Sequence, residues 1–242
     1  ANLRPCRSIP HPVSRPGIDL LVVRENTEDL YIGKEHLEDD GDTAIGEMRI
    51  TRRASERIAR AAFTQARLHG LTKVTVVHKA NVLRQTSGLF RRTALAVAAD
   101  YPDIQVEEML VDTCAMELVR APEQFGVIVT TNLFGDILSD EASMLVGGLG
   151  LAASANIGAE TAVFEPVHGS APKIAGKDEA NPLAAILSAG LMLEYLGEAQ
   201  WAAQVNQAVI QVITQRQVTA DLGGTLGTQA AAAAVVNALQ NL

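Results

Sequence analysis

Short apolar runs that alternate with amphipathic segments are the feature that most constrains the fold of this chain. Residues 18–23, 73–77, 106–111 and 127–131 are strand-length runs rich in branched apolar side chains. Between them, residues 55–69 and 88–100 have helical periodicity, and Gly70 follows the first of these helices. Strands that alternate with helices in this way predict an α/β fold in which helices flank a mixed or parallel sheet.

Outside these segments, the N-terminal half of the chain is less regular, and the chain is helical near its C-terminal end. Residues 1–16 are proline-rich and are predicted to be extended connecting chain, and residues 34–47 form an acidic loop or hairpin arm. A glycine-rich break at 147–150 predicts a boundary between an α/β half, 1–147, and a second half, 148–242. In that second half we expect an irregular stretch at 151–182 and helices at 182–196, 198–214 and 228–240.

Composition excludes several classes of function. The 242 residues are 48% apolar and 4% aromatic, as expected for a soluble globular protein. The net charge of −8, without a basic stripe, argues against a nucleic-acid partner. No apolar run approaches the length of a membrane span. Cys6 and Cys114 form neither a metal nor a redox spacing, so we expect a reduced, cytoplasmic protein.

The most informative segment is residues 132–140, which follow the last apolar run. On the predicted helix, Asp136 and Asp140 lie about 40° apart. Phe134, Ile137, Leu138 and Leu145 gather on the opposite face and are expected to pack against the sheet. A solvated acidic face is the simpler interpretation, but two carboxylates just past a strand end also suit a ligand site.

Charged residues also follow the other strands. Arg24, Lys79 and Asp112 each come directly after an apolar run, and the carboxyl ends of such strands converge on one crevice. Carboxylates without histidine or cysteine partners suit Mg²⁺ or Mn²⁺. Arg24, together with Arg4, could bind substrate carboxylates, Lys79 could act as a base, and Tyr31 could donate a proton.

Two later features concern nucleotide binding. No glycine motif of the common dinucleotide-binding type follows a strand. Residues 169–172 are nevertheless small enough to bring backbone N–H groups close to a ligand. His168, beside them, would more often be a packed residue than a ligand.

Five motifs together resemble the β-decarboxylating dehydrogenases, the isocitrate and isopropylmalate dehydrogenase family. They are residues 24–31, 78–82, 111–112, 132–140 and 168–172, and the resemblance extends over the whole chain. It implies an isopropylmalate dehydrogenase-like fold: a small α/β domain at 1–147 with a protruding dimerisation arm at about 32–50, and the C-terminal part of a large, cofactor-binding domain at 148–242. The N-terminal part of that large domain, including its specificity loop, is expected to be absent from this chain.

The resemblance also implies roles for individual residues. It assigns a divalent cation to Asp136 and Asp140, with Asp112 supplied by a second subunit of a homodimer or dimer of dimers with shared sites. Lys79, also from the partner, resembles the base and Tyr31 the acid. Arg4, Arg24, Tyr31, Lys79 and Asn81 match substrate-binding positions. The cofactor-binding positions match Asn81, His168, Gly169, Ser170, Ala171, Lys173, Asn181 and Asp221.

Within the family, residues 24–31, His78 and residues 114–116 most resemble homoisocitrate dehydrogenase of lysine biosynthesis. Isocitrate or isopropylmalate as substrate, or a non-catalytic regulatory subunit, are the alternatives. Lys173 stands where members that use NAD carry Asp, yet the other residues of a 2′-phosphate site are missing, so we expect NAD, with NADP as the alternative. Asp29 replaces a usual Gly beside the site.

Overall fold

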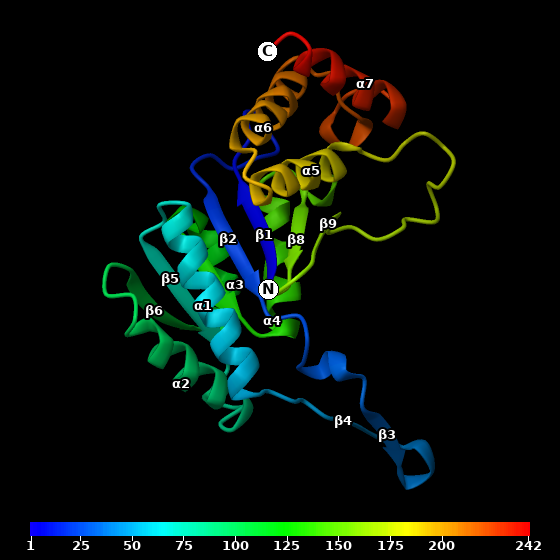
Figure 1. Cartoon of the computed structure of the whole chain (residues 1–242). Coiled ribbons are helices and arrows are strands. Elements are labelled where there is room, and N and C mark those ends of the chain that lie inside the picture. Colours follow the sequence, from blue (N-terminus) through cyan, green and yellow to red (C-terminus); the bar gives the residue numbers. More distant parts are fainter. The chain divides into compact units, whose positions relative to one another are not determined.

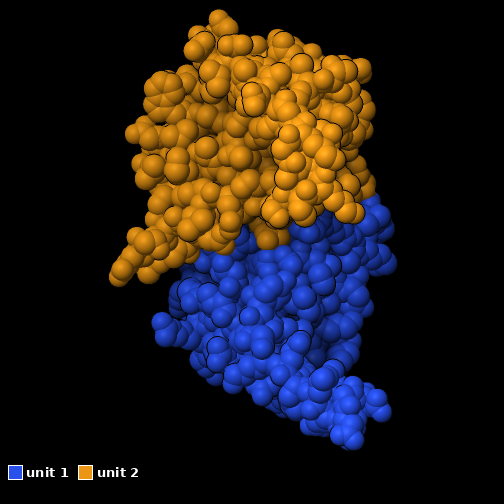
Figure 2. All heavy atoms as spheres, turned by 90° about the vertical axis from the view of Figure 1, so that its right-hand side faces the viewer, with its two compact units in different colours: residues 1–3, 20–141 blue, residues 4–19, 142–242 orange.

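The computed structural model describes all 242 residues and divides the chain into two compact units (Figure 2). Unit 1 comprises residues 1–3 and 20–141, and unit 2 comprises residues 4–19 and 142–242. The expected dimerisation arm lies in unit 1, and residues 148–242 lie wholly in unit 2. None of the helices combines the length and the apolar character needed to cross a bilayer.

Parallel strands form the centre of unit 1. β2 (Asp19–Arg24), β5 (Lys73–His78), β6 (Gln105–Leu110) and β7 (Val127–Thr130) are ordered β6-β5-β7-β2, and every neighbouring pair is parallel. The four predicted runs are therefore strands. Because they are parallel, their carboxyl ends lie along the same edge of the sheet, which is where the predicted charged residues follow.

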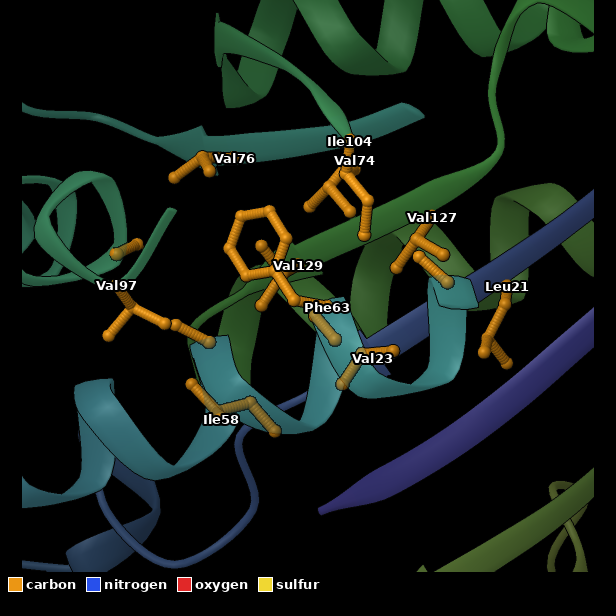
Figure 3. Packing of buried hydrophobic residues seen from close by; sticks show 14 of the residues in the cluster. Leu21, Val23, Ile58, Phe63, Val74, Val76, Val97, Ile104, Val127 and Val129 are labelled. Carbon is orange, nitrogen blue, oxygen red and sulfur yellow. The ribbon is translucent and has the colours of Figure 1, made fainter. Parts of the chain in front are cut away.

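Helices flank the strands of unit 1: α1 (Arg52–Leu68), α2 (Thr86–Ala98), α3 (Val111–Arg120) and α4 (Asn132–Leu145). α1 begins at Thr51, whose hydroxyl accepts a hydrogen bond from the N–H of Ala54, and ends before Gly70 at φ +66°. Side chains of α1 and α2 pack onto β2, β5 and β7, and Figure 3 shows the Phe63 ring among the valines of these strands. This apolar cluster is the core of unit 1.

The acidic segment forms a hairpin. β3 (Glu35–Glu38) and β4 (Thr43–Gly46) pair antiparallel, and the hairpin extends away from the rest of unit 1 (Figure 1). Residue Arg49, just after it, pairs with Asp29 in a single isolated bridge. The hairpin lies where the sequence predicts an arm, and its role in dimerisation stays a prediction.

Unit 2 combines three strands with three helices. Its strands are β1 (Asn2–Arg7), of which residues 4–7 belong to unit 2, β8 (Ala153–Ile157) and β9 (Ala162–Pro166). They follow the order β1-β8-β9, and β8 and β9 are antiparallel. α5 (Leu183–Tyr195), α6 (Ala199–Thr214) and α7 (Thr228–Leu239) match the three predicted helices. Their core includes Leu183, Val209, Val212, Ile213, Leu222 and Val235. Short 3₁₀ turns complete the chain: η1 (Leu30–Ile32), η2 (Asp39–Gly41), η3 (Pro122–Gln124), η4 (Leu149–Leu151) and η5 (Ala220–Leu222).

Two sequence predictions are wrong in unit 2. Residues 1–16 are not only connecting chain, because β1 lies within them, and residues 151–182 are not irregular throughout, because they contain β8 and β9. β1 contains Pro5, and β8 begins with the small residues Ala153, Ser154 and Ala155. Both kinds of residue are uncommon in strands, so these strands lack the usual composition.

The inward face of α4 also differs from the prediction. Ile137 is 56% exposed, whereas Leu138, Ser139, Ala142 and Ser143 are buried. The expectation that Ile137 packs against the sheet is therefore wrong. The helix buries a stripe of small residues beside one leucine, which allows its backbone to approach its surroundings closely.

Candidate active site

Arg24, the last residue of β2, is held rigidly at the start of α4. Its Nε donates to both the backbone oxygen and Oδ1 of Asn132, each at 3.0 Å, and its Nη2 donates to the same Oδ1 at 2.7 Å. Its Nη1 forms an ion pair with Oδ1 of Asp136. The side chain is only 9% exposed. A buried guanidinium with this many acceptors is fixed in position and orientation.

Gly135 makes this arrangement possible. A Cβ added to Gly135 would lie 2.6 Å from Cγ and 2.8 Å from Cβ of Arg24. Any larger residue would push the arginine side chain out of its place, so glycine is required here for the close approach of α4 to β2.

Tyr31, in the turn η1, joins the same cluster. Its hydroxyl donates to Oδ2 of Asp136 at 2.6 Å, and its ring lies 5.1 Å from the guanidinium carbon of Arg24. The phenol is 53% exposed and so faces solvent. The hydrogen bond to the Asp136 carboxylate raises the pKa of Tyr31 above its usual value, so the phenol carries its proton at neutral pH.

The cluster therefore unites three of the predicted residues: Arg24, Tyr31 and Asp136. Asp140 lies one turn further along α4, is exposed, and shares its helical face with Asp136. Asn132 belongs to the cluster too, since its amide nitrogen donates to the backbone oxygen of Glu28 at 3.0 Å. Sequence reasoning assigned no role to Asn132, although its place as the first residue of the helix was the available signal.

Lys79 and Asp112 form a second cluster. Lys79 follows β5, Asp112 lies in the first turn of α3, and the Lys79 Nζ donates to Oδ1 of Asp112 at 2.5 Å. This hydrogen bond lowers the pKa of the Asp112 carboxyl, which is 63% exposed. Asn81, two residues after Lys79, is exposed.

The two clusters do not meet within one chain. No group of three His, Cys, Asp or Glu side chains is placed to hold a cation. Asp112 follows β6 and Asp136 follows β7, and β5 lies between these strands, which corresponds to a separation of about 10 Å at the sheet edge. Within this chain, Asp112 therefore does not adjoin Asp136 and Asp140.

Most of the predicted cofactor residues lie around one cavity of unit 2. The cavity has a volume of about 750 Å³, and its lining includes His168, Gly169, Ser170, Ala171, Asn181 and Asp221. The amide of Asn181 donates to Oδ2 of Asp221 at 2.9 Å. Lys173 is exposed and does not line the cavity, and Arg4 is half-buried in β1.

Asp178 anchors the loop that forms this cavity. Its φ is +57°, its Oδ1 accepts from the N–H of Gln229 at 2.9 Å, and its backbone oxygen accepts from the N–H of Thr228 at 3.0 Å. The carboxylate thus caps the start of α7. Sequence reasoning missed this role, because a cap contributed from a distant loop leaves no local pattern.

Comparison with known proteins identifies the family. Residues 1–239 match the model of the isocitrate/isopropylmalate dehydrogenases. The isocitrate/homoisocitrate dehydrogenase of Thermus thermophilus is 56% identical over all 242 residues, which cover 72% of that protein. The 3-isopropylmalate dehydrogenase of Methanothermobacter thermautotrophicus is 52% identical over the same length, 73% of that protein.

A solved structure agrees with these matches. The crystal structure of isocitrate dehydrogenase from Methylococcus capsulatus superposes with a TM-score of 0.96 at 48% identity, and covers 99% of this chain and 73% of that one. The fold expected from the sequence, an α/β fold with a mixed sheet flanked by helices, is confirmed. The five motifs, the fold and the relatives agree, and the chain belongs to the isocitrate/isopropylmalate dehydrogenase family of decarboxylating dehydrogenases.

Proposed function

We propose that this protein oxidises and decarboxylates homoisocitrate to 2-oxoadipate and CO₂ with NAD, as a cytoplasmic homodimer or dimer of dimers in lysine biosynthesis. The observation that carries the proposal is the contact of Tyr31 and Arg24 with the two carboxylate oxygens of Asp136. An acid, a carboxylate-binding arginine and a candidate cation ligand thereby adjoin one another. The relative named for both isocitrate and homoisocitrate supports this substrate class.

The residues present fit Mg²⁺ or Mn²⁺. Asp136 and Asp140 offer only carboxylate oxygens, spaced one helical turn apart on α4, and hard divalent cations prefer such ligands. Asp112 of a partner chain would complete the set. When bound, the cation would polarise the oxygen of the hydroxy acid, and NAD would accept the hydride.

Two proton transfers fall to side chains of the protein. Lys79 would take the proton of the substrate hydroxyl as the carbon–oxygen double bond forms. After the carbon–carbon bond to the departing carboxylate breaks and CO₂ leaves, Tyr31 would donate a proton to the remaining carbon. A phenol carries its proton at neutral pH and can therefore act as the donor.

The hydroxy acid and NAD are assigned to different sets of residues. Arg24 and Arg4 would bind carboxylates of the hydroxy acid, and Asn81 would also contact it. His168, Gly169, Ser170, Ala171, Asn181 and Asp221, which line the cavity of unit 2, would bind NAD, and Lys173 would lie at its border. The lack of a cluster of cations around Lys173 favours NAD over NADP.

The separation of the two clusters and a set of exposed apolar residues support the proposed dimer. Met116 and Val119 on α3, and Ile137 and Met144 on α4, are each more than half exposed. Side chains of this kind, on the helices that begin beside the two clusters, suit an interface between subunits.

Isocitrate and isopropylmalate are the alternative substrates. A further alternative is that the protein is a non-catalytic, regulatory subunit of a dehydrogenase. A non-catalytic subunit could lose acidic and basic groups of the site, whereas Tyr31, Lys79, Asp112, Asp136 and Asp140 are all present.

The deciding experiment tests each of the three hydroxy acids with NAD and with NADP. The formation of NADH or NADPH is measured by absorbance, once in the presence of Mn²⁺ and once in the presence of a chelator. We expect turnover of homoisocitrate with NAD that requires Mn²⁺ and falls at least about 100-fold in Asp136→Asn, because the Lewis acid supplies several kcal/mol. Turnover of isocitrate alone would reassign the substrate, and turnover that is indifferent to the chelator would refute the cation.

A further inference from the structure

Asp29 has a backbone conformation that side chains rarely adopt. Its φ and ψ are +78° and −151°, and the residue is completely buried. A residue with a Cβ is strained at such a φ, and strain of this kind persists only where the surroundings compensate for it. Glycine would adopt this conformation without strain, so the aspartate side chain is expected to make stabilising contacts that glycine cannot make.

Both carboxylate oxygens of Asp29 bind backbone N–H groups. Oδ1 accepts from the N–H of Leu30 at 2.9 Å, and Oδ2 accepts from the N–H of Leu133 at 3.0 Å. The N–H of Asp29 donates to the backbone oxygen of Arg49 at 2.8 Å. Leu30 begins the turn η1, and Leu133 lies at the start of α4, where N–H groups have no partner within the helix. One negative charge therefore caps two elements at once.

These two elements carry the two halves of the cluster. Tyr31 is the residue after Leu30, and Asp136 is three residues after Leu133, within one helical turn. The Asp29 carboxylate thus joins the turn that bears the phenol to the helix that bears the carboxylate. The distance of 2.6 Å between the Tyr31 hydroxyl and Asp136 depends on how these two backbones are held together.

We propose that Asp29 is a positioning residue, which sets the place of the Tyr31 hydroxyl relative to Asp136 by fastening η1 to the first turn of α4. The catalytic part of this inference depends on the proposed function, while the structural part does not. The neighbouring bond from Asn132 to the backbone oxygen of Glu28 also connects the two segments, but it reaches neither Leu30 nor Leu133.

Two variants distinguish the effect of the Asp29 carboxylate from the effect of its backbone conformation. Asp29→Gly removes the acceptors and allows the same φ without strain, and Asp29→Asn keeps one acceptor oxygen in a residue that also tolerates positive φ. Phe63→Leu is the control, because it weakens the core of unit 1 without contacting the cluster. For each protein we would measure melting, kcat and KM for the hydroxy acid, and amide exchange at Leu30 and Leu133.

We expect kcat of Asp29→Gly to fall about tenfold or more with a smaller change in KM, and both amides to lose protection, since small displacements of catalytic groups cost rate. Asp29→Asn should recover part of each effect, and Phe63→Leu should lower melting while kcat stays unchanged. Unchanged kcat in Asp29→Gly despite faster exchange at both amides would overturn the positioning role. Unchanged exchange would overturn the contact itself.

A measurement without turnover keeps the inference testable if the proposed function fails. The chain has 3 tyrosines, so ring signals of labelled Tyr31, Tyr101 and Tyr195 can be followed separately by NMR. In Asp29→Gly the Tyr31 signal should move and the other two should not. A Tyr31 signal that stays in place would refute the fastening of η1 to α4, whatever the enzyme assays give.

Discussion

The separation of the two charged clusters leads to a prediction about mixed dimers. Lys79 and Asp112 contact each other, as do Tyr31 and Asp136, and no single chain brings the two pairs together. If each site takes one pair from each subunit, a chain with Lys79→Ala and a chain with Asp136→Asn are defective in different halves. In a mixed dimer, both defects then fall in the same site, and the other site is intact.

The expected magnitude follows from counting. Equal amounts of the two variants, mixed before assembly, give about half mixed dimers, each with one working site of two, so the activity should return to about a quarter of that of the unmodified protein. The assay is NAD(P)H formation after coexpression or after joint refolding. Lys79→Ala mixed with Asp112→Asn is the matched control, because every mixed dimer then carries one defect in each site and should stay inactive.

Two outcomes would refute this reasoning. If the Lys79 and Asp136 variants stay as inactive together as they are apart, although mixed dimers are detected by mass spectrometry, the sites are not shared in this way. If the control mixture recovers as well, Lys79 and Asp112 do not act in the same half-site.

Three further predictions concern packing and chemistry in unit 1. Gly135→Ala should lower kcat/KM about 100-fold, because the new Cβ displaces the Arg24 side chain; unchanged kinetics would show that Arg24 can adjust. Phe63→Ala should lower the free energy of unfolding by about 3–5 kcal/mol in urea titration, since its ring is completely buried in the core, and a loss below 1 kcal/mol would contradict that. Burial raises the pKa of the Cys114 thiol to about 12, so iodoacetamide should modify it only after denaturation, and rapid alkylation of the folded protein would disprove its protection.

Much of unit 1 could be predicted from the sequence because β2, β5 and β7 are buried on both faces. Such strands are continuous runs of branched apolar residues, as at residues 127–130. β8 could not be found in this way, because Ala153, Ser154 and Ala155 carry no strand signal. It forms through antiparallel backbone pairing with β9, which the types of its own side chains do not indicate.

In the candidate site, motifs identified residues individually, but they did not show contacts between segments that are distant in the chain. The motifs identified Arg24, Tyr31 and Asp136, and the structure brings these three together. The contributions of Asn132, Gly135 and Asp29 depend on contacts of α4 with β2 and η1, which lie more than 100 residues earlier in the chain. Ile137 was misplaced for a related reason, because helical periodicity shows that a helix has two faces but not which face the fold buries.

The cavity loop of unit 2 is fixed at both ends, by Asp178 at one end and at the other by Val167, whose N–H donates to the backbone oxygen of Ala152 at 2.9 Å. Residues 168–177 are almost entirely exposed, whereas Asp178 is fastened to α7 by two hydrogen bonds and Thr228 donates to the backbone oxygen of Ala180. The middle of such a loop, around Lys173, is less constrained than its two ends. Trypsin should therefore cut after Lys173 sooner than after Lys177, which lies beside the anchor. A nucleotide held in the cavity should slow the first cut, so the rate of proteolysis becomes a measure of cofactor occupancy.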